Sequence, residues 1–369
     1  MKRILLLLFL FLTLTATAAQ LGDSLLSADG PYLTYDSLGT GATLLTVDLK
    51  GRIHQKHVKA LRSDYRLEVQ TADGSHHFEV QLHNVQQPRW DYPMPDEMFI
   101  TSDPHGNFDC LYTLLVGNRV MDDKCNWTFG RGHLVIIGDV MDRGVDVVPI
   151  YWLMYKLEAQ AAEAGGALTF VFGNHEPFIL NNDNRYTERK YTHLAELLST
   201  RYSTLWSPRT ELGRWLLSRN CMTRIGRQLI VHAGLGADFY RMNLSIPEVN
   251  ALFPAGLYMR SRARRGVGDK VYRLHANQGP IWYRGLVRDD PKYRPVSSDT
   301  LDLILQRYDV DRLLVGHTIN DEITTYYEGR VIDVNVDNLE NRTLGRSRAL
   351  LMRDGKTYIV GDHGIMKQL

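Results

Sequence analysis

The chain has 369 residues, of which 44% are hydrophobic and 23% charged, and its formal net charge at pH 7 is +1. This length and composition allow a sizeable hydrophobic core in one large domain with a small appendage. The near-neutral charge argues against a broad basic surface for a nucleic-acid duplex or an acidic membrane.

Residues 1–18 have the pattern of a secretory signal peptide. Two basic residues precede an apolar run at 4–14, and the small residues that follow include Ala16 and Ala18, which fit the A-x-A cleavage pattern. The alternative is an uncleaved anchor, but this run is much shorter than the ~20 residues that span a bilayer. We therefore expect a periplasmic or secreted protein with no membrane span after cleavage.

Residues 19–95 are predicted to form a small β-rich N-terminal region. Apolar and polar residues alternate on both sides of Asp73-Gly74, which indicates a hairpin, and a second strand pair is expected about Lys50-Gly51. The Pro-rich segment QPRWDYPMPDE at 87–97 follows and is interpreted as a linker.

Residues 96–369 are predicted to form an α/β catalytic domain. Short apolar runs typical of buried strands alternate with helical segments, such as 147–164 and most of 178–224. The runs in question are EMFIT, HLVIIGD, LTFVFGN, QLIVHAG and DRLLVGHT. Further strands are expected after residue 322, with a turn at Asp354-Gly355.

The three cysteines are Cys110, Cys125 and Cys221. An odd number permits one disulfide at most. A bridge between Cys110 and Cys125 and three buried small side chains both fit the sequence.

Polar residues that can bind a metal or move a proton follow each of five predicted buried strands. In chain order they are Asp103 and His105; Asp139, Asp142 and Arg143; Asn174 and His175; His232; and His317. Taken singly, such an Asp is a turn former or helix cap, and such a His a hydrogen-bonded core residue. Because ligand sites gather beyond the carboxyl ends of strands in α/β sheets, their recurrence favours one shared site.

These residue types suit hydrolysis at two metal ions. Asp, Asn and His favour Mn, Fe or Zn. Two such ions share an anionic ligand, activate a water and hold a phosphoryl group. Asp103 and Asp139 offset the metal charge, and Arg143 is placed to neutralise phosphate oxygens.

The motifs SDPHG, GDVMDRG, GNHE, VHAG and VGHT, in this order, resemble those of calcineurin-like metallophosphoesterases of the phosphoprotein phosphatase type. GPIWYRG at 279–285 is similar to a motif of the bacterial Shewanella-like protein phosphatases. The resemblance covers roughly residues 98–337. It implies a four-layer α/β/β/α sandwich. The β-rich N-terminal region lies outside the resemblance and is expected to be a small appendage.

The resemblance also implies roles for individual residues. The metal ligands would be Asp103 and His105 at the first ion, Asp139 bridging both, and Asn174, His232 and His317 at the second. Arg143 and Arg284 would grip the phosphate together with Asn174. A metal-bridging hydroxide would attack, and His175, oriented by Asp142, would be the general acid. Glu176 is expected to orient its neighbours.

The sequence departs from the family pattern at the first motif, where Ser102 replaces the usual Gly and Pro104 fills the variable position. We expect these residues to change the loop rather than the metal affinity. HAG and GHT also occur in the diadenosine tetraphosphatase branch, so the motifs indicate a phosphoester without naming it.

The expected function is therefore that of an exported two-metal phosphatase. Its partner would be a phosphorylated small molecule or a protein phosphorylated on Ser, Thr or Tyr. The alternatives are a dinucleoside polyphosphate or nucleotide pyrophosphohydrolase, and a catalytically inactive binding module. The complete set of expected residues favours an enzyme. Another basic cluster, Arg260, Arg262, Arg264 and Arg265, either lines the cleft or is a solvated loop.

Overall fold

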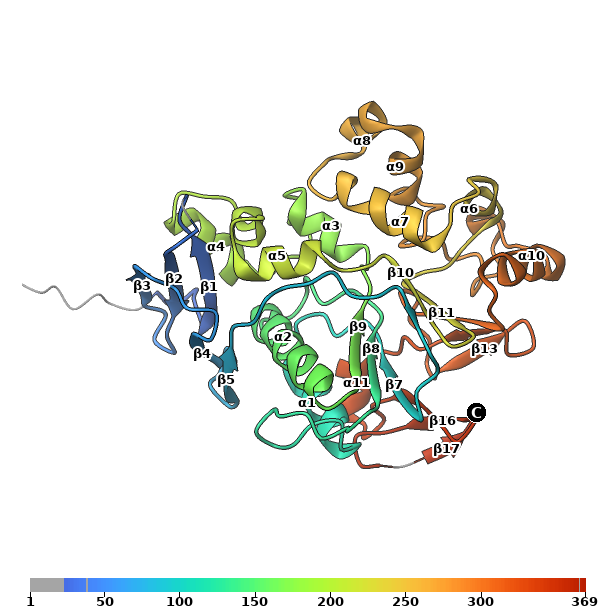
Figure 1. The fold of residues 1–369 in the computed structure, drawn as a ribbon, viewed down its shortest axis with the longest axis horizontal. Helices are drawn as coiled ribbons and strands as arrows, with labels where there is room; N and C mark the ends of the chain where they lie inside the picture. Colours follow the sequence, from blue (N-terminus) through green and yellow to red (C-terminus); the bar gives the residue numbers. More distant parts are fainter. Residues whose placement is uncertain (1–22, 38, 365) are drawn as a thin grey trace, which may run out of the picture.

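The computed structural model describes residues 23–37, 39–364 and 366–369, and Figure 1 shows its fold. The predicted signal peptide lies outside the described residues. Within them, the strands form two six-stranded sheets, one three-stranded sheet and one two-stranded hairpin. None of the helices in this part of the chain is both long and apolar enough to cross a membrane.

The first large sheet contains three of the predicted buried strands. β7 (Glu97–Thr101), β8 (His133–Ile136) and β9 (Ala167–Phe170) run parallel at one side. β15 (Ala349–Arg353), β16 (Lys356–Val360) and β17 (Met366–Gln368) continue the sheet in antiparallel pairing beyond β7. The carboxyl ends of β7, β8 and β9 therefore meet at one edge.

The second large sheet has the order β13-β14-β12-β11-β10-β6. Its strands are β6 (Asp91–Tyr92), β10 (Met222–Ile225), β11 (Gln228–Val231), β12 (Arg312–Val315), β13 (Thr324–Tyr326) and β14 (Val331–Asp333). β11, β12 and β14 are parallel, so their carboxyl ends also share an edge.

The two sheets face each other across a hydrophobic core. Met98 and Ile100 of β7 belong to the core cluster between the sheets, together with residues of β12 and β14. Phe99 points the other way, into the cluster shared with the outer helices. This two-residue alternation is expected of a strand that is buried on both faces.

Helices cover the outer faces of the sheets. α2 (Val147–Glu163) packs against β9, and α7 (Ile246–Leu252) packs against β10. Figure 1 shows α2 beside β9 of the first sheet and α10 (Ser298–Tyr308) beside the second sheet. The predicted four-layer α/β/β/α sandwich is confirmed.

The described residues form several further helices. They are α1 (Phe108–Gly117), α3 (His175–Leu180), α4 (Arg189–Leu197), η1 (Tyr202–Trp206), α5 (Glu211–Leu217), α6 (Ala237–Arg241), η2 (Phe253–Gly256), α8 (Ser261–Val267), α9 (Asp269–Leu274), η3 (Pro291–Tyr293) and α11 (Asn338–Thr343).

The N-terminal region is rich in β-structure, as predicted. β1 (Asp29–Tyr35), β2 (Ala42–Val47) and β3 (Ile53–Val58) form the three-stranded sheet. β4 (Arg66–Gln70) and β5 (His77–Gln81) pair antiparallel around the predicted turn.

This region packs closely on the rest of the chain. The indole N–H of Trp152 in α2 donates to the carbonyl of Pro31 at 2.9 Å, and the Tyr35 hydroxyl donates to Glu211 at 2.6 Å. β6 lies within the Pro-rich segment, which therefore joins the second sheet rather than acting only as a linker. A domain boundary at 95/96 remains a prediction.

The cysteines Cys110, Cys125 and Cys221 are buried and free in the described structure. They fit the interpretation as small buried side chains.

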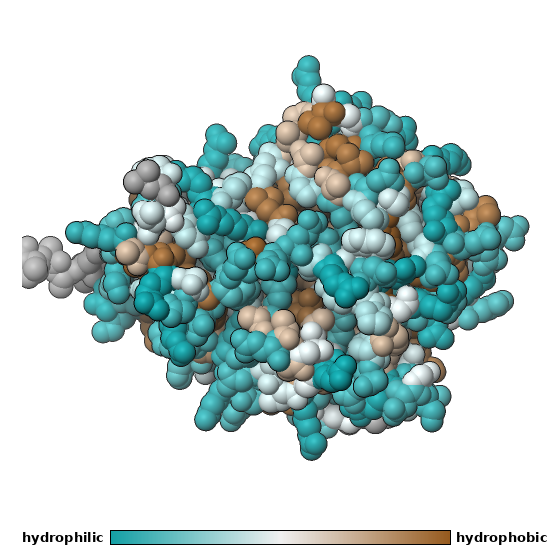
Figure 2. All heavy atoms as spheres, in the orientation of Figure 1, coloured by the Kyte–Doolittle hydropathy of each residue, from teal (hydrophilic) through white to brown (hydrophobic). Residues whose placement is uncertain are grey.

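Figure 2 shows that one face of the molecule is largely hydrophilic, with hydrophobic residues in small separate patches.

Candidate active site

The loops that follow the buried strands hold several residues in the left-handed backbone region. The φ values are 47° for Asp103, 43° for His105, 54° for Asp139, 70° for Asp142, 66° for Arg143 and 66° for His317. Residues other than glycine seldom adopt this conformation, and where they do so together the surrounding fold must enforce it. Six of the residues that the sequence marks as candidates for the site are thus held in this conformation, as are ten other non-glycine residues of the described chain.

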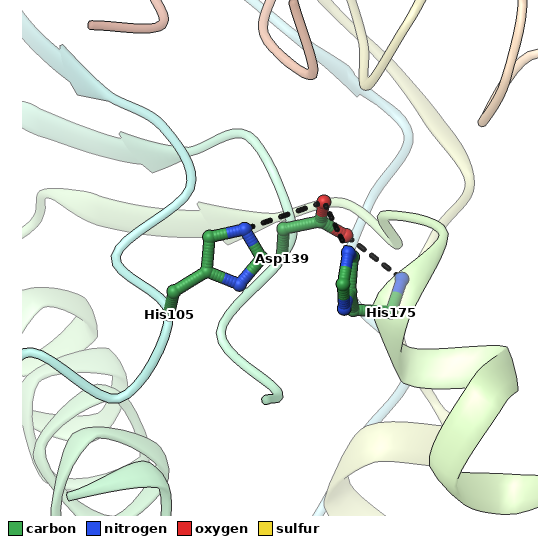
Figure 3. Close-up of side chains that lie close together, drawn as sticks. All are labelled: His105, Asp139 and His175. Carbon is green, nitrogen blue, oxygen red and sulfur yellow. Dashed lines mark hydrogen bonds and ion pairs between the residues drawn. The ribbon is translucent and has the colours of Figure 1, made fainter. Parts of the chain in front are cut away.

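The carboxylate of Asp139, in the loop after β8, lies at the centre of the site. Its Oδ2 is 3.9 Å from Nε2 of His105, 4.0 Å from Nε2 of His175 and 3.2 Å from Nε2 of His232. Figure 3 shows His105, from the loop after β7, and His175, at the start of α3, on either side of this carboxylate.

Two groups of side chains bring their ligand atoms within 4.8 Å of one another: His105, Asp139 and His175, and then Asp139, His232 and His317. Asp139 belongs to both groups. It is the only residue that the two groups have in common.

The imidazoles are oriented to present Nε2 to the centre. Nδ1 of His105 donates to the carbonyl of Met141 at 2.8 Å, and Nδ1 of His232 donates to the carbonyl of Ile137 at 2.7 Å. Because a carbonyl only accepts, each Nδ1 carries a proton, and in the neutral imidazole Nε2 then has the lone pair, as in histidines that bind metals. Burial opposes protonation of His232, but the carboxylates of Asp139 and Asp103 raise its pKa to about 9, so a metal at Nε2 would have to displace a proton there.

The buried donors at this centre fit a divalent metal. Nε2 of His317 is buried without a hydrogen-bond partner among the described residues. Burial lowers the pKa of His105 to about 4 and the pKa of His317 well below its ordinary value, so both are neutral at pH 7. Neutral imidazole and carboxylate are the forms that coordinate Mn, Fe or Zn.

Asp103 lies at the edge of this centre and outside both groups. Its Oδ1 accepts from the Ser102 hydroxyl and from the backbone N–H of His317 at 3.2 Å, and its Oδ2 accepts from Asn335 at 2.9 Å. Burial, aided by the charge of Asp139, raises the pKa of Asp103 to about 6. The side chain is thus held by three donors close to the candidate metal ligands.

Asn174 is the residue that precedes α3. Its Oδ1 lies 3.2 Å from Nε2 of His232, and its side chain is buried. This places the amide oxygen of Asn174 beside Nε2 of His232.

Glu176 organises the loop that carries Asp139. Its fully buried carboxylate accepts hydrogen bonds from four backbone N–H groups and one hydroxyl. The donors are the N–H groups of Asp139, Val140, Met141 and Gly173, at 2.8–3.2 Å, and the Tyr151 hydroxyl at 3.1 Å. This arrangement agrees with the expectation that Glu176 orients its neighbours.

His175 and Asp142 form a buried pair. Nδ1 of His175 lies 2.7 Å from Oδ2 of Asp142, whose other oxygen accepts from the Thr187 hydroxyl at 2.8 Å. Burial alone would lower the pKa of His175, but the carboxylates of Asp139 and Asp142 outweigh it and raise that pKa. The imidazole is therefore suited to hold a proton.

The two arginines differ in their surroundings. Arg143 is exposed, with its guanidinium 5.7 Å from the centre of the Tyr186 ring. Arg284 is half-buried, and its Nη1 donates to the Thr318 hydroxyl at 2.8 Å and the His317 carbonyl at 3.1 Å. Arg284 is thus anchored directly to the residues of the candidate metal site.

Several residues at the site are missing from the sequence prediction. Asn335 lies two residues after the end of β14. It therefore also follows a strand, and the pattern of polar residues after strands could have identified it. The aromatic rings of Phe178 and Trp282 lie 5.5 Å and 5.6 Å from those of His175 and His317. Trp282 is inside the GPIWYRG motif, whereas nothing in the local sequence marks Phe178.

The arrangement of two facing sheets with carboxylates and imidazoles at their carboxyl edges is that of a metal-dependent phosphoesterase. The family model described as calcineurin-like phosphoesterase matches residues 98–321, and the chain belongs to this family of hydrolases.

Known proteins with similar sequences include Shewanella-like phosphatases. The chain is 26% identical over 218 residues to Shewanella-like protein phosphatase 1 of Plasmodium berghei (strain Anka), an alignment that covers 58% of this chain and 59% of that protein. It is 30% identical over 99 residues to Shewanella-like protein phosphatase 2 of Arabidopsis thaliana, covering 27% of this chain and 25% of that protein. The chain thus spans less than two thirds of the length of each of these two relatives.

A solved structure is similar over almost the whole molecule. The cold-active protein-tyrosine phosphatase of a psychrophile Shewanella species aligns with a TM-score of 0.82 and 28% identity, over 93% of this chain and 99% of that one. The expected resemblance to Shewanella-like phosphatases is confirmed.

Proposed function

We propose that this protein hydrolyses phosphomonoesters at a two-metal centre and that its substrates include phosphorylated side chains of proteins. The position of Asp139 in both groups of ligand atoms is the observation that carries the proposal. Metal ions bound there would polarise the phosphate and supply an activated water for its hydrolysis.

The residues that would hold the ions are those predicted from the sequence. Asp103 and His105 would hold one, Asp139 both, and Asn174, His232 and His317 the other. The buried, partnerless Nε2 of His317 and the fixed tautomers of His105 and His232 support this assignment.

His175 would deliver the proton that the leaving oxygen requires. Its Nδ1 faces Asp142, so Nε2 is the nitrogen available to the substrate. The geometry also places this Nε2 among possible ligand atoms. We favour the acid because Nδ1 of His175 faces the carboxylate of Asp142, which stabilises an imidazolium, whereas Nδ1 of His105 and of His232 faces a backbone carbonyl.

Arg143 and Arg284 would bind the phosphate oxygens, together with the amide of Asn174. A guanidinium neutralises the charge that develops on these oxygens in the transition state. The anchoring of Arg284 to His317 and Thr318 supports this role, because it fixes the cation beside the metal site.

Phosphotyrosine is the side chain that we expect the protein to favour. The aromatic rings of Phe178 and Tyr186 pack against that of His175, and the ring of Trp282 packs against that of His317. Such rings can stack on a phenyl ester. The similar solved structure is itself described as a protein-tyrosine phosphatase.

Hydrolysis of p-nitrophenyl phosphate with added Mn²⁺ tests the reaction. We expect Asp139→Asn to lower kcat by about 100-fold or more, because loss of a shared ligand exceeds the 10–100-fold effect of losing a supporting contact. Asp123→Asn, at an exposed position, is the matched control and should keep wild-type activity. No turnover with Mn²⁺, Fe²⁺ or Zn²⁺, or full activity in Asp139→Asn, would refute the proposal.

A panel of substrates then separates the classes of phosphoester. Phosphotyrosine and phosphoserine peptides should be hydrolysed faster than diadenosine tetraphosphate. The reverse order would make the protein a pyrophosphohydrolase.

We also propose that the protein is exported. The signal-like composition of residues 1–18 supports this, and N-terminal sequencing of the chain recovered outside the cytoplasm tests it. A mature chain beginning near Ala19 is expected; a chain that keeps Met1 in the cytoplasm would refute export.

A further inference from the structure

A cavity of about 520 Å³ lies next to the candidate active site, between α3 and the α8–α9 pair. Figure 1 shows α8 and α9 as a small lobe above α7, on the side of α3. Asn174, which we assign to the metal site, forms part of the cavity wall. The cavity and the site therefore share a residue.

Two aromatic side chains lie between the cavity and the candidate active site. Phe178 and Trp282 line the cavity, and their ring centres are 5.5 Å apart. The Phe178 ring also packs against that of His175, and the Trp282 ring against that of His317. A substrate with its phosphate beside these two histidines would extend past the aromatic pair into the cavity.

The far side of the cavity contains a buried arginine. Arg264 in α8 is only 7% exposed, whereas Arg262 and Arg265 beside it are exposed. Its Nε donates to the carbonyl of Gly256 at 2.8 Å, but its Nη2 has no hydrogen-bond partner in the described part of the chain. Of the two alternatives for this basic cluster, a solvated loop does not fit Arg264, which lines the cavity instead.

No carboxylate balances this guanidinium among the described residues that line the cavity. The lining is otherwise neutral, and Asn181, Asn277 and Gln278 contribute amide groups to it. Burial lowers the pKa of Arg264 to about 10, so the side chain remains cationic at neutral pH. A buried, incompletely bonded cation is costly unless an anion pairs with it.

We propose that Arg264 and this cavity bind a second anionic group of the substrate whose phosphate ester is hydrolysed at the active site. This inference rests on the proposed function and narrows its substrates to acidic phosphoesters. The shared chemistry is a carboxylate or phosphate that accepts hydrogen bonds from a guanidinium and from amides. Its source is either an acidic side chain next to a phosphorylated residue or the second phosphate of a small bisphosphate.

Paired substrates test the proposal with the full chain and Mn²⁺. One pair consists of phosphotyrosine peptides that differ only in having Glu or Gln beside the phosphorylated residue. The other pair is a hexose bisphosphate and the matching monophosphate. We expect the wild type to prefer the acidic member of at least one pair by about 10-fold or more in kcat/KM, the size of one hydrogen bond to a charged group. The pair that shows the preference identifies the source of the anion.

Substitutions test whether Arg264 causes the preference for the acidic substrate. Arg264→Met should abolish it while kcat for p-nitrophenyl phosphate, which has no second anionic group, stays within about twofold of wild type. Arg262→Met, at an exposed position of the same helix, should keep it. Arg264→Lys keeps the positive charge but loses the Nε contact with Gly256. It should therefore retain part of the preference for the acidic substrate, which separates the effect of the charge from that of the contact.

Three results would overturn the inference. They are the absence of a preference in both pairs for the wild type, a preference that survives Arg264→Met, and an equal loss in Arg262→Met. The first needs no variant and so does not depend on how Arg264→Met folds. Failure to hydrolyse p-nitrophenyl phosphate would instead refute the proposed function itself, and the substrate inference with it.

Discussion

Nδ1 of His175 lies 2.7 Å from Oδ2 of Asp142, and both residues are almost completely buried, with 4% and 2% of their surfaces exposed. This contact leaves Nε2 of His175 directed toward the carboxylate of Asp139. In this geometry the carboxylate of Asp142 orients the imidazole of His175 through Nδ1 and stabilises its protonated form. Nε2 can then donate its proton as a general acid.

Asp142→Asn should lower kcat by about 100-fold, a typical contribution of general acid catalysis. The loss should be larger for phenyl phosphate than for p-nitrophenyl phosphate, because the poorer leaving group depends more on the acid. Equal losses for both esters would contradict the role of His175.

The same variant should change the pH profile. The raised pKa of His175 keeps its imidazole protonated to higher pH, so activity should fall as pH rises through that pKa. Removing the charge of Asp142 lowers the pKa and should move this alkaline limb to lower pH. If the alkaline fall in activity stays at the same pH in Asp142→Asn, a group other than His175 causes it.

Glu176→Gln should weaken both metal binding and stability. The amide nitrogen of glutamine donates where Glu176 accepts, so at least one of the N–H groups of Asp139, Val140 and Gly173 would lose its acceptor. A buried group left unsatisfied costs about 1–3 kcal/mol, and loss of such an orienting contact weakens metal affinity by about 10–100-fold.

Urea unfolding of the metal-free protein and Mn²⁺ titration measure these effects separately. Glu163→Gln, at the exposed end of α2, is the control and should be neutral. Unchanged Mn²⁺ affinity in Glu176→Gln would show that the carboxylate does not position Asp139.

Gly316→Ala should disrupt the loop that carries Asp103. A Cβ at this position would lie 1.9 Å from the Ser102 hydroxyl oxygen and 2.8 Å from Oδ1 of Asp103. The absence of a side chain at Gly316 is therefore what makes room for Ser102, the residue that departs from the family pattern. We expect Mn²⁺-dependent activity to fall by at least about 10-fold, as when a contact that positions a ligand is lost.

A double-mutant cycle measures this coupling. Ser102→Gly removes the closer clash, so the pair Ser102→Gly and Gly316→Ala should be more active than Gly316→Ala alone. Additive effects of the two substitutions would mean that Ser102 and Gly316 do not depend on each other.

Asp146 should make stability depend on pH. It precedes α2, and its Oδ1 accepts from the N–H of Ala72 in the β4–β5 turn at 2.6 Å. Burial raises its pKa from 3.8 to about 6. Because the folded state then binds the proton more tightly, this stabilisation is complete below pH 3.8 and is lost as pH rises through 6.

Asp146→Asn keeps an acceptor for Ala72 but removes the titration. Each pKa unit corresponds to about 1.4 kcal/mol, and allowing for partial exposure we expect a gain of about 1–2 kcal/mol in unfolding free energy at pH 7 relative to pH 4.5. Urea unfolding at both pH values, with a chelator present, measures it. A variant with the same pH dependence as the wild type would exclude Asp146 as its source.

The amino-acid sequence by itself determined which segments became buried strands and which polar residues followed them. These features depend on the residues within each segment and next to it. Apolar runs such as those at β7 and β8 end where glycine and aspartate form turns. The edge shared by Asp103 and Asp139 could be expected because parallel strands such as β7 and β8 align their carboxyl ends. His317 follows β12 of the second sheet, so its approach to them depends on how the two sheets pack.

Other features depended on contacts between residues far apart in the chain. Glu176 accepts hydrogen bonds from N–H groups of two loops, and Asn335 donates to Asp103. The Pro-rich segment contributes β6 to a sheet whose other strands all lie beyond residue 220. Arg264 is buried beside the site although its neighbours in sequence are exposed. Only the tertiary structure decided these points, because burial and hydrogen bonding are set by what packs against a residue, and sequence neighbours do not reveal that.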